Sequence, residues 1–148
     1  MTTIRPAAPA DAPSVARLLG ELGYPTDAAD VPRRLAAIRA EGNDVFLATD
    51  GDAVLGLVSL VHYATIHASG PTAYIMALVV SSDARGRGVG RVLVDHAKRW
   101  ATERGCRRLT VTSAEHRADA HQFYPACGMP YTGRRFSVAI EGGDGARG

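Results

Sequence analysis

The feature that most constrains this chain is the run Arg85-Gly86-Arg87-Gly88-Val89-Gly90, which joins an apolar segment to a helix-patterned one. Residues 74–80 are predicted to form a strand, and residues 89–104 repeat apolar side chains at helical spacing. At such a junction, backbone N–H groups and the positive end of the helix can bind a phosphate, and glycines leave room for it. Because arginines alternate with the glycines, fixed charges favour the same anion. The run predicts a strand–loop–helix unit with an anion site.

The spacing of this loop differs from two commoner phosphate loops. It is not G-x-G-x-x-G, and no acidic residue stands about twenty positions later at the end of a second strand. No Lys-Ser or Lys-Thr follows, as G-x-x-x-x-G-K-[ST] requires. A solvated basic loop or a nucleic-acid contact stays open, although arginine-glycine segments that bind nucleic acid are longer and repeated. An anion site of a third kind is the better interpretation.

Composition favours one globular domain. The chain has 148 residues, 46% hydrophobic and 22% charged, with a net charge of +2. We expect a single domain over residues 1–140 and a disordered tail at 141–148, because the tail has almost nothing to bury. The charge is too mild to indicate nucleic acid by itself.

The remaining composition argues against metals and membranes. Cys106 and Cys127 are too few for a disulfide framework and lack metal-ligand spacing, so we expect both to be structural and no metal to bind. No run of about 18 apolar residues predicts a transmembrane helix, and the N-terminus lacks the order of a secretory signal. We therefore expect a cytoplasmic protein.

Periodicity and turn residues predict an ordered series of strands and helices. The predicted strands are residues 2–5, 45–49, 53–63, 74–80, 109–113 and 136–140, with Asp50-Gly51 as a hairpin signal. The predicted helices begin near Asp11, Asp30, Val89 and Ala118, and the first three end at Gly23, Gly42 and Gly105. This order predicts an α/β (α+β) fold, a mixed sheet flanked by helices.

Two motifs and this element order resemble the GNAT superfamily of acyl-CoA-dependent N-acetyltransferases. The family motif Arg/Gln-x-x-Gly-x-Gly/Ala is matched by Arg85, Gly88 and Gly90, and residues 116–129 resemble the family's closing helix, with Tyr124 four residues before Gly128. The resemblance covers roughly residues 2–140. It implies a mixed, mostly antiparallel sheet of about six or seven strands with about four helices.

The resemblance also implies how acetyl-CoA binds as co-substrate. Strands 74–80 and 109–113 would splay apart, and the pantetheine arm would pair with the first of them at Leu78, Val79 and Val80, with Val79 N–H polarising the thioester carbonyl. Tyr124 would protonate the departing CoA thiolate, because a phenol stays protonated at neutral pH. The pyrophosphate would take N–H groups from the glycine loop, namely from Gly86, Arg87, Gly88, Val89, Gly90 and Arg91, with Arg85 alongside.

The acceptor side is less defined. Tyr24, His62, Tyr74 and Met76 are candidate substrate-contacting residues. Relatives often carry an acidic residue midway along the fourth strand, where this chain has Met76 and Ala77, so the proton of the amine would go to His62, Glu115, a water chain or solvent before binding. Pro125 is expected to kink or loosen the helix beside Tyr124.

The resemblance therefore implies an N-acetyltransferase that moves an acetyl group to a primary amine by direct attack in a ternary complex. The alternatives are a non-catalytic acyl-CoA-binding or sensor module and, in a third class, a nucleic-acid binder. We expect a small-molecule or peptide amine as acceptor, and neither nucleic acid nor a membrane as partner. Dimerisation is common in the family, so a homodimer is compatible with the resemblance.

Overall fold

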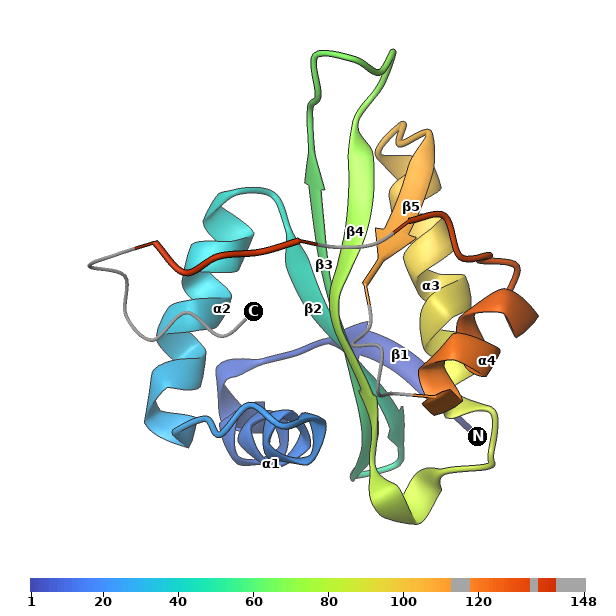
Figure 1. Ribbon diagram of the computed structural model, residues 1–148. Helices are drawn as coiled ribbons and strands as arrows, with labels where there is room; N and C mark the ends of the chain where they lie inside the picture. Colours follow the sequence, from blue (N-terminus) through green and yellow to red (C-terminus); the bar gives the residue numbers. More distant parts are fainter. Residues whose placement is uncertain (113–117, 134–135, 141–148) are drawn as a thin grey trace. The chain divides into compact units, whose positions relative to one another are not determined.

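The computed structural model describes residues 1–112, 118–133 and 136–140. The chain forms two compact units, Met1–Val111 and Thr112–Gly148. The first contains a five-stranded sheet in the order β1-β2-β3-β4-β5 (Figure 1). Its strands are β1 Thr3–Pro6, β2 Asp44–Asp50, β3 Ala53–Tyr63, β4 Thr72–Val80 and β5 Arg108–Val111.

The sheet is mixed and mostly antiparallel, as the sequence predicts. Strands β1 to β4 pair in antiparallel fashion, and β5 runs parallel to β4. The β2–β3 hairpin is also confirmed, but its two turn residues are Gly51 and Asp52, because Asp50 pairs with Ala53. Gly51 has a φ of 60°, which a tight hairpin turn favours.

All four helices end in the same way. In each, a glycine at positive φ follows the last turn, and two backbone N–H groups bond back to carbonyls of that turn, which defines the Schellman motif. The helices are α1 Ala12–Leu22, α2 Val31–Ala40, α3 Val89–Glu103 and α4 Ala118–Ala126, with glycines 23, 42, 105 and 128 as the caps. None of the helices in the described ranges is long and apolar enough to cross a membrane.

Helices cover both faces of the sheet in the first unit. Val15, Leu18 and Leu35 of α1 and α2 form one buried core with Leu57 and Val79 of the strands. On the other face, α3 packs close against the sheet. A Cβ on Gly56 of β3 would stand only 3.1–3.2 Å from the side chains of Leu93 and Val89. The small residue therefore allows the start of α3 to approach β3 and β4.

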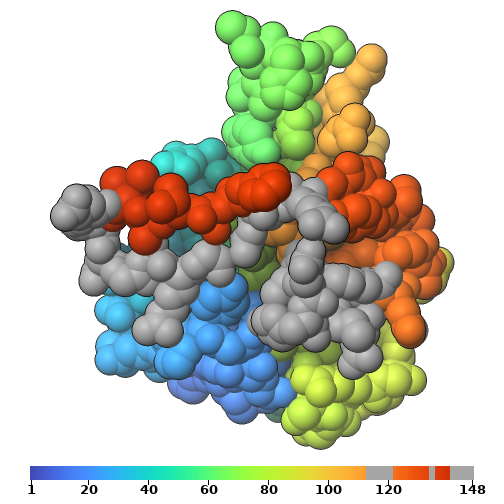
Figure 2. All heavy atoms as spheres, viewed as in Figure 1, coloured from blue at the N-terminus to red at the C-terminus, as the bar shows by residue number. Residues whose placement is uncertain are grey.

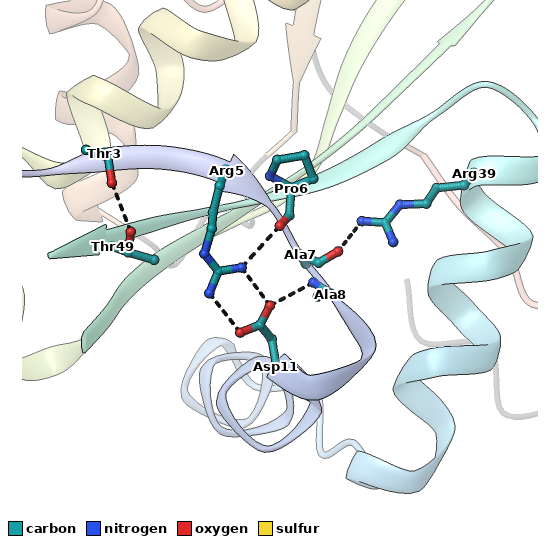
Figure 3. A network of polar contacts seen from close by, with 8 residues as sticks. All are labelled: Thr3, Arg5, Pro6, Ala7, Ala8, Asp11, Arg39 and Thr49. Atoms are coloured by element: carbon teal, nitrogen blue, oxygen red, sulfur yellow. Dashed lines mark hydrogen bonds and ion pairs between the residues drawn. The ribbon is translucent and has the colours of Figure 1, made fainter. Parts of the chain in front are cut away.

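A polar network holds β1 against the start of α1 (Figure 3). Arg5 donates to both carboxylate oxygens of Asp11 at 2.8 and 2.9 Å, and the N–H of Ala8 donates to the same carboxylate at 2.7 Å. The Arg5 guanidinium thereby lowers the pKa of Asp11. Asp11 is the residue before α1, as predicted, but its side chain makes these contacts and does not cap the helix N–H groups. Arg39 of α2 also donates to the carbonyl of Ala7.

One predicted strand is not formed. Residues 136–140 carry no strand in the structure, although their apolar side chains alternate. Phe136, Val138 and Ile140 are exposed. Alternation predicts a strand only when a neighbour supplies backbone hydrogen bonds, and the described sheet has five strands where about six or seven were expected.

Candidate functional site

The second half of β4 differs from the first half in its pairing. Thr72 to Ile75 pair with β3 on one side and β5 on the other, and in the described ranges Ala77 to Val80 have registered partners on β3 alone. The change coincides with a β-bulge, because Ser59 of β3 pairs with Ala77 and the next residue, Leu60, pairs with Ile75. Met76 is therefore an extra residue. Bulges bend a strand and increase its local twist, and Met76 marks the point beyond which β4 has no registered partner on β5 in the described ranges.

The register between β3 and β4 determines which backbone groups of β4 face away from β3. Ser81 N–H donates to Leu55 C=O at 2.7 Å, and in an antiparallel ladder every second residue points the same way. Val79 therefore faces β3, and its carbonyl oxygen lies 2.9 Å from the point where a Cβ on Gly56 would stand. Leu78 and Val80 face away from β3. This geometry does not favour Val79 as the donor to an acetyl carbonyl and favours its two neighbours.

The glycine loop follows β4 through a short 3-10 turn, Ser82–Ala84, and leads directly into α3. Gly86 and Gly88 have φ values of 80° and 78°, and no other described atom lies within 4 Å of the point where a Cβ on either would stand. Gly88 is the residue before α3, so the first N–H groups of that helix point toward the loop. This backbone conformation and this open space are compatible with binding of an anion.

Two arginines of the loop have different surroundings. The side chain of Arg87 lies 3.7 Å from an oxygen of Asp50, the last residue of β2. Arg85 has an extended backbone immediately before the positive-φ glycines. Figure 2 shows this part of the chain, in yellow-green, at the surface of the molecule.

His62 takes a structural position. Asn43 Oδ1 accepts the backbone N–H of His62 at 2.9 Å and lies 2.8 Å from His62 Nδ1, within hydrogen-bond distance of both groups. The His62 ring also packs edge-on against Trp100 of α3, with centroids 5.3 Å apart. This side chain therefore points to the α3 face of the sheet.

The other predicted substrate residues lie elsewhere in the first unit. Met76, in the bulge, is 59% exposed, and Tyr24, directly after α1, is 42% exposed. Tyr74 is half-buried and pairs with Val61 in the half of β4 that has a neighbouring strand on both sides. His62 points to the face opposite the one that α1 and α2 cover, so the structure does not group it with Tyr24. Glu115 lies outside the described residues.

Tyr124 lies in the last turn of α4, in the second unit. Its carbonyl accepts the N–H of Met129 at 2.9 Å, and the carbonyl of Pro125 accepts the N–H of Gly128 at 3.0 Å. The spacing of Tyr124 and Gly128 is therefore that of a helix residue and its Schellman glycine. Pro125 does not end the helix at Tyr124, since α4 continues to Ala126. The Tyr124 ring packs edge-on against Phe123, with centroids 5.1 Å apart.

Sequence reasoning missed two residues of α1 that contact the loop. Arg17 donates to Ser81 Oγ at 3.1 Å, and Glu21 accepts the N–H of Ser82 at 2.9 Å. Their spacing of four residues in a helix predicts that they pair with each other. The sequence carries no signal that the pair reaches a loop about sixty residues later.

Comparison with known proteins identifies the class. The model of the acetyltransferase (GNAT) family matches residues 13–129. The uncharacterized N-acetyltransferase YhdJ of Bacillus subtilis (strain 168) is 30% identical over 108 residues, which cover 72% of this chain and 75% of that protein. The peptidyl-lysine N-acetyltransferase YjaB of Escherichia coli (strain K12) is 45% identical over 58 residues, 39% of this chain and 36% of that protein.

A solved structure agrees with these relatives. A putative acetyltransferase from Agrobacterium tumefaciens str. C58 superposes with a TM-score of 0.82 at 28% identity, covering 93% of this chain and 99% of that one. The chain belongs to the GNAT family. It is an acyl-CoA-dependent N-acetyltransferase, as its sequence predicts.

Proposed function

We propose that this enzyme transfers an acetyl group from acetyl-CoA to a primary amine by direct attack in a ternary complex. The observation that carries the proposal is the half-paired end of β4, which leads straight into the glycine loop. An extended ligand arm can add to an open strand edge, and its phosphates can reach the N–H groups of the following loop. Few other ligands combine an amide-containing arm with a pyrophosphate.

In this proposal the pantetheine arm pairs with Leu78 and Val80, whose backbone groups face away from β3. The pyrophosphate takes the N–H groups between Gly86 and Arg91, beside the Arg85 guanidinium. The acetyl carbonyl accepts a backbone N–H from the same strand edge, and we assign that role to Leu78 because it stands nearer the bulge. A fixed N–H at this point stabilises the oxyanion that develops when the amine attacks.

The chemical step forms a C–N bond and breaks the C–S bond. The neutral amine attacks the thioester carbon, the amine loses its proton, and CoA leaves as a thiolate that Tyr124 protonates. No enzyme nucleophile is needed. Burial raises the pKa of the Cys106 thiol, which disfavours the reactive thiolate, and Cys127 is buried.

The acceptor in this proposal is a small-molecule or peptide amine. Met76 and Ala77 offer no proton acceptor in the bulge, so the amine proton leaves through water or is lost to solvent before binding. The acidic side chains of α1 and its flanking turns also have partners. Asp11 pairs with Arg5, Glu21 with Arg17, and Asp30 with Arg33. A strongly polycationic acceptor would find little free negative charge there.

Two measurements test the proposal. Acetyl-CoA at about a hundredfold excess over its dissociation constant should stabilise the protein by roughly 2.7 kcal/mol, whereas NADH and ATP should not. Thiol release from acetyl-CoA should then depend on an added amine. Binding without release for any amine in a broad panel would favour an acyl-CoA sensor, which the lack of a proton acceptor at Met76 makes the second candidate. No stabilisation by acetyl-CoA would contradict both functions.

A further inference from the structure

Helix α1 contacts the segment that joins β4 to the glycine loop. Glu21 Oε1 accepts the N–H of Ser82 at 2.9 Å, and Arg17 Nη1 donates to Ser81 Oγ at 3.1 Å. Arg17 and Glu21 also pair with each other at 3.2 Å, one helical turn apart. In Figure 2 the blue atoms of α1 adjoin the yellow-green atoms of this segment.

Ser81 is buried and makes hydrogen bonds through both its backbone and its hydroxyl group. It is 2% exposed, its N–H donates to Leu55 C=O at 2.7 Å, and its carbonyl accepts the N–H of Ala84 at 2.9 Å. Its hydroxyl donates to Asp83 at 2.6 Å while accepting from Arg17. The hydroxyl thus uses its proton on one side and a lone pair on the other. The hydrogen bond from Ser81, aided by the positive charges of Arg17 and Arg87, lowers the pKa of Asp83.

The same pair extends to β3. Arg17 Nη2 lies 3.4 Å from the carbonyl oxygen of Val54. Two side chains of one helix therefore contact two backbone groups, Val54 C=O on β3 and Ser82 N–H after β4, and one side chain, the hydroxyl of Ser81. The side chain of Glu21 is 24% exposed, and its hydrogen bond with the Ser82 N–H lies at the protein surface.

We propose that Arg17 and Glu21 are positioning residues that hold the glycine loop in register with the open edge of β4. The inference rests on the proposed function, since it concerns the donor site of that enzyme. Acetyl-CoA must meet the N–H groups of β4 and of the loop at the same time, so any freedom between the two must be lost on binding. A preformed connection removes that cost and lowers the dissociation constant.

The test measures acetyl-CoA affinity by isothermal titration calorimetry on the full chain, with melting temperature recorded for every variant. Glu21→Ala removes the acceptor of the Ser82 N–H and should raise the dissociation constant about tenfold, the effect of a lost charge-assisted hydrogen bond. Glu21→Gln keeps an oxygen acceptor and should stay within about threefold of the wild type. Ser81→Ala removes the contact with Arg17 at nearly constant volume and should raise the dissociation constant several-fold.

Asp11→Ala is the matched control. It breaks an ion pair at the other end of the same helix, one that holds β1 and does not contact the loop. It should lower the melting temperature and leave acetyl-CoA affinity unchanged. The positioning role would be overturned if Glu21→Ala bound acetyl-CoA as tightly as the wild type. It would also be overturned if Asp11→Ala lost as much acetyl-CoA affinity as Glu21→Ala. A wild-type protein that does not bind acetyl-CoA would instead overturn the proposed function, and this inference with it.

Discussion

The two halves of β4 have the same neighbour on one side and different surroundings on the other. In the first half, Ala73 and Ile75 are buried and the strand is paired on both sides. In the second half, Leu78 and Val80 are half-buried, and the described ranges provide a partner on β3 alone. A single bulge residue, Met76, stands between the two. One strand can therefore serve as a core element and as a binding edge, with the bulge as the boundary.

The glycine loop and the second half of β4 offer the same kind of binding group. Both present backbone N–H groups rather than side chains, and backbone positions are set by the sheet and by α3. Side-chain identity along this edge matters less than strand register and glycine geometry.

The largest expected effect comes from the loop. Gly88→Val forces a β-branched residue to a φ of 78° and places a Cβ in the space assigned to the phosphate. We expect acetyl-CoA affinity to fall by about a hundredfold or more, since several charge-assisted hydrogen bonds are lost. Gly105→Val is the matched control, because Gly105 has a φ of 73° at the opposite end of the same helix. Calorimetry should show similar loss of stability in both and loss of affinity in Gly88→Val alone.

Tyr124→Phe tests chemistry apart from binding. Removing the hydroxyl removes the proposed proton donor and leaves the ring, so we expect turnover to fall by about ten- to a hundredfold with acetyl-CoA affinity nearly unchanged. Phe123→Leu, on the neighbouring residue, is a control for packing. Steady-state thiol release measures both. Unchanged turnover in Tyr124→Phe would remove this residue from the mechanism.

Gly56→Ala tests the side of β4 that stays paired. The added Cβ would lie 2.9 Å from the carbonyl oxygen of Val79 and close to Leu93, so helix or strand must shift. We expect a loss of about 1–3 kcal/mol of unfolding free energy. Urea denaturation measures it, and Gly20→Ala, with no described atom within 4 Å of the added group, should not lose stability. Equal stability of Gly56→Ala and wild type would contradict the close approach of α3.

The smallest effect concerns pH. Burial, aided by Arg99, lowers the pKa of His96, whose Nε2 is buried and lacks a partner in the described residues. As pH falls below about 6.5, the unfolded chain takes up a proton that the folded state resists, so stability decreases. His96→Leu should make the loss between pH 7 and 5.5 smaller than in wild type. An identical loss in both proteins would show that His96 titrates normally in the folded state.

Much of this architecture follows from local signals in the sequence. Gly23, Gly42 and Gly105 end their helices as expected, because a positive φ after the last turn favours glycine strongly. The mixed sheet was likewise predictable from the order of elements. The strand predicted at 136–140 is not formed, because alternation alone cannot supply a hydrogen-bonding neighbour.

The site was only partly predictable. The glycine loop follows from its motif, but the bulge at Met76 has no signature in the sequence. The resemblance gave Leu78, Val79 and Val80 as pairing positions, and the register shows that the backbone groups of Leu78 and Val80 face away from β3 while those of Val79 face it. The hydrogen bond between the Ser82 N–H and Glu21 joins residues far apart in the chain, so the sequence alone does not predict it. The contact of His62 with Asn43 likewise has no signal in the sequence.

Residue-resolved amide exchange along β4, measured by NMR with and without acetyl-CoA, tests the central claim most directly. We predict that the N–H groups of Leu78 and Val80 exchange rapidly in the free protein and become protected when acetyl-CoA binds, while Val79 is protected throughout by β3. Equal protection of all three in the free protein would contradict the open edge. If the N–H groups of Leu78 and Val80 stay unprotected when acetyl-CoA is bound, acetyl-CoA does not use this edge of β4 for binding.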